Sequence, residues 1–342
     1  MRCYLSIVIL VFILAGRVMA QTGGDNTYEF LNLSTNALVS SLGGMNVSLV
    51  SNDPSLAYYN PALLNSKASG NISLNYTNYL SGINYGYVSY AKHLDSYGSF
   101  SAGITYLNYG KFDKADQSGL ITGTFNASEY ALNFIWSYNI DTLFHIGLNL
   151  KPVFSHLDKY TSVGILTDIG GLYQSRNGLY SAGITIRNLG TQVTSYSGTR
   201  ESMPFEIIAG VSARLEHAPF RFSLTARHLQ RYNMIHESEM QDENMNEKYN
   251  GISGVSENIM RHLIFSAEFL PTENFFITTS YNYLRRKELA VSSRSSTVGF
   301  SLGAGIKLSG MDLSLSRSKY HLAGSLTNIS VLIKPGSIKQ SN

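Results

Sequence analysis

The chain has 342 residues, of which only 14% are charged, against roughly 25% in an ordinary soluble domain. Its formal net charge of +3 gives no basic surplus of the kind that nucleic-acid binding needs, so we expect no nucleic-acid partner. With 23 tyrosines and 30 glycines beside so few charges, the composition indicates a surface that faces something other than water.

Residues 1–20 have the features of an export signal. Arg2 supplies a positive charge, an apolar run from Leu5 to Leu14 follows, and Val18 to Ala20 fits a small-residue cleavage site. The run is too short for the roughly 20 apolar residues that span a bilayer as a helix. We therefore expect this signal peptide to be removed, and Cys3, the one cysteine of the chain, to leave with it.

The segment 21–69 does not alternate and precedes the first expected strand. Three short motifs stand out in it: Gly43-Gly44, Asp53-Pro54 and Asn60-Pro61. Paired glycines permit a tight turn, an aspartate before proline can close a turn, and an asparagine before proline can open a short helix. These residue types give the segment a structural role, and we expect a plug or cap on the periplasmic side of the domain that follows.

Residues 70–334 alternate between apolar and small or polar side chains, which is typical of a barrel wall. No stretch after the signal is long enough for a transmembrane helix, and only a closed barrel then satisfies every backbone group in a membrane. We predict an all-β, transmembrane antiparallel barrel of about 14 strands in a bacterial outer membrane. The strands are expected near 70–79, 83–93, 97–109, 126–139, 142–156, 162–174, 178–189, 204–215, 219–230, 259–270, 273–284, 296–307, 310–319 and 323–334.

Alternate connections between these strands are short, and several of the others are long. Short periplasmic turns and long extracellular loops are the rule in such barrels. We therefore expect both termini, including a tail at 335–342, on the periplasmic side. The side chains assigned to the lumen are mostly small or polar, with six basic ones: Lys151, Arg187, Arg214, Arg221, Arg227 and Lys307.

Two long connections carry candidate contact residues. The connection 231–258 is acidic and contains methionines, which adapt to a partner surface, and its candidate docking residues are Glu237, Glu239, Met240, Asp242 and Glu243. The alternative is a solvated loop. A second connection offers basic candidates for contacts with the phosphates of lipopolysaccharide or another anionic glycolipid: Arg285, Arg286, Lys287 and Arg294. Ordinary seating in the lipid leaflet is the alternative there.

Catalytic chemistry has little support in the sequence. The eight histidines show no metal-ligand spacing, and the mature chain has no cysteine to join them. Ser316 to Lys319 match a Ser-x-x-Lys pattern, but they fall in an expected strand without the partner motifs of that enzyme class. We expect no catalytic residue, no metal and no cofactor.

The segment from Tyr28 to Leu63 resembles the N-terminal signature of the PorV/PorQ family, relatives of the FadL-type barrels. The shared features are a Leu-Gly-Gly turn at 42–44, an acidic turn at 52–54 and an Asn-Pro-Ala motif at 60–62. The opening at 30–33 and the chain length are most similar to the PorQ branch. This resemblance implies a non-enzymatic component of the type IX secretion system of Bacteroidota. Such a barrel anchors a soluble PorZ-like surface subunit, alongside PorU and PorV, in the complex that processes and attaches secreted cargo.

Two other functions stay open at this point. The first is a FadL-type outer-membrane transporter of hydrophobic molecules, which would need an apolar pocket along the lumen. The polar side chains assigned to the lumen argue against such a passage. The second is a barrel that shuttles cargo by itself, and the soluble protein that copurifies would distinguish it from an anchor.

Overall fold

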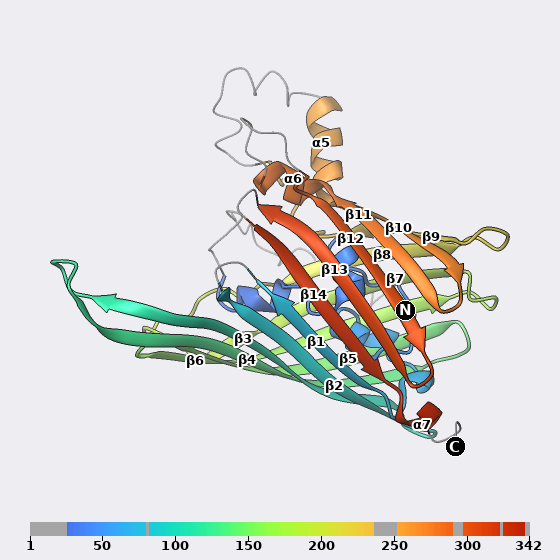
Figure 1. Cartoon of the computed structure of the whole chain (residues 1–342), viewed down its shortest axis with the longest axis horizontal. Coiled ribbons are helices and arrows are strands. Elements are labelled where there is room, and N and C mark those ends of the chain that lie inside the picture. Colours follow the sequence, from blue (N-terminus) through green and yellow to red (C-terminus); the bar gives the residue numbers. More distant parts are fainter. Residues whose placement is uncertain (1–25, 80–81, 236–251, 290–296, 322–323, 339–342) are drawn as a thin grey trace, which may run out of the picture.

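The computed structural model describes residues 26–79, 82–235, 252–289, 297–321 and 324–338. Fourteen strands in these ranges form one closed barrel, in which each strand pairs antiparallel with its neighbours in the chain and β1 closes the ring against β14 (Figure 1). The strands are β1 (Ile72–Asn78), β2 (Asn84–Leu94), β3 (Gly98–Ala115), β4 (Ile121–Asn139), β5 (Phe144–Leu157), β6 (Tyr160–Gln174), β7 (Tyr180–Thr194), β8 (Glu206–Arg214), β9 (Phe220–Ala226), β10 (Leu263–Thr272), β11 (Phe275–Asn282), β12 (Phe300–Leu308), β13 (Met311–His321) and β14 (Gly324–Ile333).

The predicted antiparallel barrel of 14 strands is confirmed, but several strands differ from their predicted bounds. β7 continues to Thr194, and β10 begins only at Leu263, because residues 259–262 belong to the helix α5 (Ile252–His262). The β3–β4 hairpin extends several residues beyond the predicted bounds, and the rings of Phe112 and Phe125 stack across it with centroids 5.2 Å apart. In contrast, β9 ends early at Ala226. The Arg227 guanidinium just after it binds Glu206 of β8, with Nε 2.7 Å from Oε1.

The predicted division between outward and inward side chains also holds. On β4, Tyr130, Phe134 and Tyr138 are exposed on the outer face, whereas Asn133 and Ser137 are buried toward the lumen. Apolar side chains cover the outer face of the other strands in the same way. An apolar outer band around a polar interior is the pattern of a barrel that sits in lipid.

Residues 26–71 lie inside this barrel and fill its lumen, and we call them the plug (Figure 1). They form five short helices: η1 (Glu29–Asn32), α2 (Ala37–Ser41), η2 (Pro54–Tyr58), η3 (Pro61–Leu63) and η4 (Ser66–Ala68). Helices of this length are not stable alone in water. The barrel wall supplies the missing stabilisation: Leu42, Met45 and Tyr58 of the plug share one apolar cluster with Tyr87 and Ile264 of the wall.

The plug runs from one end of the barrel to the other. Asn26 forms a parallel bridge with Ser202 at the end that carries the long connections, and Ser69 binds His93 at the end that carries the short turns. β14 ends at Ile333, also at the short-turn end. The first described residue, Asn26, therefore lies at the opposite end of the barrel from Ile333, where β14 ends. Both termini, which we expected on the periplasmic side, lie outside the described residues.

Three further helices lie outside the wall. α5 (Ile252–His262) leads directly into β10, α6 (Tyr283–Leu289) follows β11, and α7 (Pro335–Ile338) follows β14 in the predicted tail. Figure 1 shows α5 and α6 together at the long-connection end, with α7 at the other end. Within the described ranges, no helix combines the length and hydropathy that a membrane span requires.

Candidate functional site

The main candidate site is the contact between the plug and the wall, where inward-facing glycines of the wall allow the plug backbone to approach closely. A Cβ atom on Gly183 would lie 2.0 Å from the carbonyl oxygen of Val47, and one on Gly147 would lie 2.4 Å from the carbonyl carbon of Pro61. A Cβ on Gly170 would lie 2.0 Å from Oδ1 of Asn60. Such separations are shorter than any side chain tolerates, so this part of the wall is shaped around a plug in close contact.

The Asn60-Pro61 motif is buried at this contact. The Asn60 side chain caps η3 by accepting a hydrogen bond from the Ala62 N–H at 3.0 Å. Its amide nitrogen donates to the carbonyl oxygen of Val47 at 2.8 Å and to that of Gly171 in β6 at 3.1 Å. Pro61 begins the helix, where its missing N–H costs no hydrogen bond. The motif thus shapes the plug and ties it to β6.

The other two motifs also shape the plug. Gly43 and Gly44 have φ values of 93° and 94°, which favour glycine, and Leu42 just before them ends α2. The carbonyl oxygen of Gly43 accepts hydrogen bonds from Asn282 at 3.2 Å and Arg285 at 3.1 Å. Asp53 caps η2, which begins at Pro54, and its carboxylate also accepts a hydrogen bond from Asn36 at 2.9 Å. All six motif residues lie in the plug, and a structural role for them stays our prediction.

Hydroxyl groups join the plug to strands on opposite sides of the barrel. Ser48 lies 2.7 Å from Ser212 in β8, and Ser41 accepts from Thr278 in β11 at 2.6 Å, in each case between hydroxyl oxygens. The Ala37 N–H donates to Ser330 Oγ in β14 at 2.7 Å. Each bond adds only about 1 kcal/mol, but all are buried, and an unpaired buried group would cost more. Together they hold the plug in one position.

Arg187 of β7 links the wall to two segments of the plug. Its side chain is fully buried, and Nη2 donates to the carbonyl oxygen of Leu31 at 3.1 Å. The guanidinium carbon also lies 5.1 Å from the centroid of the Tyr58 ring, within range of a cation–π interaction. This arginine, which the alternation placed in the lumen, therefore stabilises the plug.

Acidic partners accompany three of the other inward basic residues. Lys151 pairs with Asp168 at 2.7 Å, Arg221 with Glu268 at 2.5 Å, and Arg227 with Glu206 at 2.7 Å. Sequence reasoning missed the three acids, although alternation places each on an inward position, where an unpaired charge would be costly. Arg214 and Lys307, in contrast, are exposed at the short-turn ends of β8 and β12.

The predicted contact residues of the long connections are placed only in part. Glu237, Glu239, Met240, Asp242, Glu243 and Arg294 lie outside the described residues. Arg285 belongs to α6 and is buried, because its guanidinium binds the plug at Gly43, so it is not a rim contact as we expected. Lys287 binds Glu257 of α5 at 3.1 Å, and Arg286 follows Arg285 in α6.

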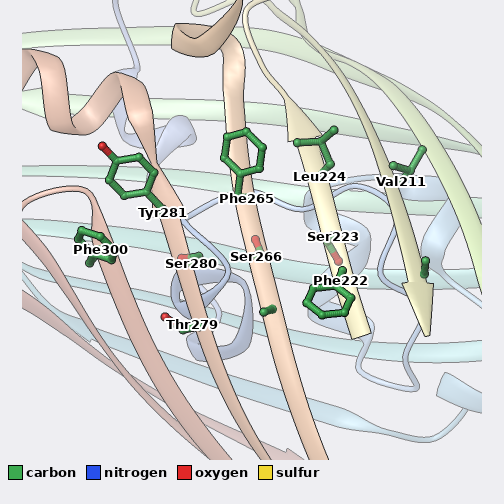
Figure 2. Close-up of a pocket in the computed structure, with 12 residues that line it drawn as sticks. Val211, Phe222, Ser223, Leu224, Phe265, Ser266, Thr279, Ser280, Tyr281 and Phe300 are labelled. Atoms are coloured by element: carbon green, nitrogen blue, oxygen red, sulfur yellow. The ribbon is translucent and has the colours of Figure 1, made fainter. Parts of the chain in front are cut away.

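An apolar groove of about 490 Å³ lies on the outer face of the barrel across β8 to β12. Figure 2 shows Leu224, Phe265, Tyr281 and Phe300 standing along neighbouring strands at its sides. Its floor includes small residues, among them Ala213, Ala267 and Thr279. Its apolar walls are exposed on the outer face, so the groove opens on the lipid-facing band, while the buried Ser223, Ser266 and Ser280 also line it.

A metal site was not expected. Across the part of the chain that the structure describes, no group of three or more histidine, cysteine, aspartate or glutamate side chains is placed to hold a metal ion.

The closed barrel, its apolar outer band and its internal plug define an outer-membrane β-barrel, and comparisons place it among known folds. No protein-family model matches the sequence, and no curated protein matches it. The toluene transporter TbuX of Ralstonia pickettii aligns with a TM-score of 0.53 at 12% identity, over 89% of this chain and 98% of that chain. The CymD monoaromatic hydrocarbon channel aligns with a TM-score of 0.51 at 13% identity, over the same shares.

These structural neighbours are FadL-like outer-membrane barrels. A FadL homologue of Pseudomonas aeruginosa aligns with a TM-score of 0.48 at 10% identity. At such identities the likeness shows the fold alone, since one fold carries many functions. The chain therefore has the fold of a FadL-like outer-membrane barrel.

Proposed function

We propose that this chain is a non-enzymatic outer-membrane component of a type IX secretion system in Bacteroidota. It anchors a soluble PorZ-like surface subunit, alongside PorU and PorV, in the complex that processes and attaches cargo. The observation that carries the proposal is the filled lumen: the plug backbone presses on wall glycines such as Gly183, and buried hydroxyls and Arg187 hold it. A barrel filled in this way is suited to carry a partner.

The assignment to a secretion system rests on the resemblance of the N-terminal motifs to the PorV/PorQ family. Asn60 and Gly43, at the centre of two of these motifs, make the contacts that fix the plug. In this proposal the long-connection end faces the cell exterior and carries the partner. Lipid and lipopolysaccharide surround the apolar band, and the partner subunits carry out any chemistry.

A second candidate is a FadL-type transporter of hydrophobic molecules, and the comparisons favour it over the secretion role. TbuX is named as a toluene transporter and CymD as a monoaromatic hydrocarbon channel. A transporter of this kind needs an apolar passage. In this chain the apolar groove lies on the outer wall, while the lumen beside β5 to β8 holds ion pairs such as Lys151–Asp168. The lumen chemistry is why we place transport second.

An affinity capture from the native outer membrane tests the proposal. Tagged, detergent-solubilised wild-type protein is compared with a variant in which the 231–258 connection is shortened. We expect the wild type to retain a secretion-system surface subunit and the shortened variant to lose it. Recovery of the wild-type barrel without any such subunit, together with bound hydrophobic solute, would instead support transport.

A further inference from the structure

One row of outward side chains across the strands of the barrel is polar at one end and apolar at the other. The register places Arg317 of β13 opposite Leu302 of β12 and, on its other side, opposite Thr327 of β14. Beyond β14 the row continues with Asn78 and Asn84, which are both polar. Beyond β12 it continues with side chains that are small or apolar: Thr279, Ala267, Phe222 and Ala213. The two halves of the row meet at Arg317.

Arg317 places a positive charge on the outer face of the barrel. Its side chain is exposed, while its neighbours Ser316 and Ser318 are buried toward the lumen. Within the described ranges, no aspartate or glutamate forms an ion pair with it. A basic side chain on the lipid face destabilises a barrel unless it reaches the headgroup region or an anionic partner. The anion that Arg317 meets on this face is therefore one that the lipid supplies.

The row also changes depth in the membrane. Asn78 is the last residue of β1 and Asn84 the first of β2, so both lie at the end that carries the long connections. Ala213, in contrast, lies next to Arg214, where β8 reaches its short turn. Long connections face the exterior in outer-membrane barrels. The polar half of the row therefore lies toward the headgroups of the outer leaflet, and the apolar half descends from it into the hydrocarbon.

The apolar half of the row forms part of the outer groove. Ala213, Phe222, Ala267 and Thr279 all line the groove, whose volume of about 490 Å³ is that of a ligand site, within roughly 300–1,000 Å³. Figure 2 shows the ring of Phe265 standing beside the groove on the neighbouring part of β10. Because the groove opens on the lipid-facing band and its exposed walls are apolar, a hydrocarbon chain is the occupant that fits it.

The charge and the groove are close enough for one molecule to reach both. Neighbouring strands lie about 4.8 Å apart, so Thr279 in the groove is two strands, or about 10 Å, from Arg317. In the other direction, the polar half of the row extends over three strand spacings from Arg317 to Asn84, or about 14 Å. This width fits a headgroup of several sugar and phosphate groups better than a single small phosphate.

We propose that Arg317 and the outer groove form one binding site for lipid A, the phosphorylated and acylated glycolipid of the outer leaflet. A phosphate of lipid A binds the Arg317 guanidinium, whose planar set of N–H donors matches phosphate oxygens. Thr327 and Asn78 offer hydrogen bonds to the sugar, and one acyl chain lies in the groove. The inference goes beyond the proposed function and does not rest on it, because an anchor and a transporter would both stand in this leaflet.

Binding of purified lipid A to the full-length barrel in a neutral detergent tests the charged part of the site. Native mass spectrometry counts the lipid-bound barrels at each lipid concentration. Arg317→Gln is compared with Arg176→Gln, because Arg176 is exposed in the short turn between β6 and β7 at the other end of the barrel. We expect Arg317→Gln to weaken binding about 10-fold and Arg176→Gln to bind as the wild type does. Dephosphorylated lipid A should bind the wild type and Arg317→Gln equally.

A second variant fills the groove and leaves the charge in place. Ala267→Phe adds a ring inside the groove, whereas Ala102→Phe adds the same ring to the exposed outer face of β3, away from the groove. Heat-dependent gel mobility checks that each barrel is folded. We expect Ala267→Phe to weaken binding of lipid A about 10-fold and Ala102→Phe to leave it unchanged.

Three results would contradict this site. Undiminished binding by Arg317→Gln, or an equal loss in Arg176→Gln, would show that this arginine does not hold the phosphate. Undiminished binding by folded Ala267→Phe would show that no acyl chain lies in the groove. Phosphatidylglycerol that binds the wild type more tightly than lipid A does would show that the occupant is a phospholipid, and the choice of lipid A would be wrong.

Discussion

The Lys151 amino group lies 2.7 Å from the Asp168 carboxylate, and neither side chain is exposed to solvent. Asp168 also accepts hydrogen bonds from Asn149 at 3.1 Å and from the Asn188 N–H at 2.8 Å, and Lys151 donates to the Asn188 side chain. A buried pair offsets its desolvation only when its remaining bonds are satisfied. This pair meets that condition. It places two charged groups in the lumen, where an apolar passage would need hydrocarbon side chains.

Removing one partner of this pair should destabilise the barrel strongly. We expect Asp168→Asn or Lys151→Met alone to lower the free energy of unfolding by about 3–5 kcal/mol, because each leaves a buried group without its counter-charge. The double variant should lose less than the sum of the two. Urea unfolding of the detergent-folded barrel, followed by gel mobility, measures all three, and additive losses would show that the pair is not coupled.

A side chain at Gly183 should displace the plug. Its Cβ would lie 2.0 Å from the carbonyl oxygen of Val47, which is backbone and cannot rotate away. We expect Gly183→Leu to produce ion-conducting steps in a planar bilayer. Gly171→Leu is the matched control, since the nearest atom to its Cβ is the Ile184 methyl at 3.4 Å. Gly183→Leu barrels that fold normally but conduct no ions would show that the position of the plug does not depend on this contact.

A disulfide that joins the plug to the wall should not change how tightly the barrel binds the surface subunit. The hydroxyl oxygens of Ser48 and Ser212 are 2.7 Å apart, and the mature chain as expected has no cysteine that could interfere. We expect the oxidised pair Ser48→Cys and Ser212→Cys to bind the surface subunit as tightly as the reduced pair does. A loss of binding on oxidation, reversed by reductant, would mean that plug movement is part of function.

The attachment of α5 to α6 should weaken in acid. Burial alone would raise the pKa of Glu257, but hydrogen bonds from Tyr283 and Lys287 and the Lys287 charge hold it below its usual range. A depressed pKa contributes stability that is present above the unfolded-state value and lost as the pH falls through the folded value. The protection of the α5 amides, measured as the exchange rate relative to that of an unstructured peptide at the same pH, should therefore fall as the pH drops below about 4.5. The Glu257→Gln variant should exchange fast at neutral pH as well, whereas equal protection in variant and wild type would contradict this role.

The sequence predicted the barrel well because alternation reports which face of a strand each residue occupies. It placed Lys151 and Arg187 inside correctly. It could not place Asp168 opposite Asn149, because the register of β5 and β6 depends on the geometry of their connection. The contacts between wall glycines and the plug could not be predicted from the sequence either, because they depend on the path of a plug that has no periodic pattern.

Helix α5 shows a different limit. Ile252, Val255 and Ile259 have helical spacing, but the first two stand in the connection 231–258 and Ile259 in the strand predicted at 259–270, whereas the structure places all three in α5. The signal was a short apolar stripe next to an expected strand. Only the structure shows that the polar side of the helix faces the barrel.

Uptake of labelled toluene tests most directly whether this barrel is a closed anchor. Cells that lack other routes for aromatic hydrocarbons are compared with and without the wild-type protein, and with the oxidised Ser48→Cys and Ser212→Cys pair. We predict the same uptake rate in all three, because buried hydrogen bonds hold the plug against the wall and the ion pair of Lys151 and Asp168 places charge in the lumen. An uptake rate that the wild type increases and the oxidised pair abolishes would contradict the anchor and establish transport.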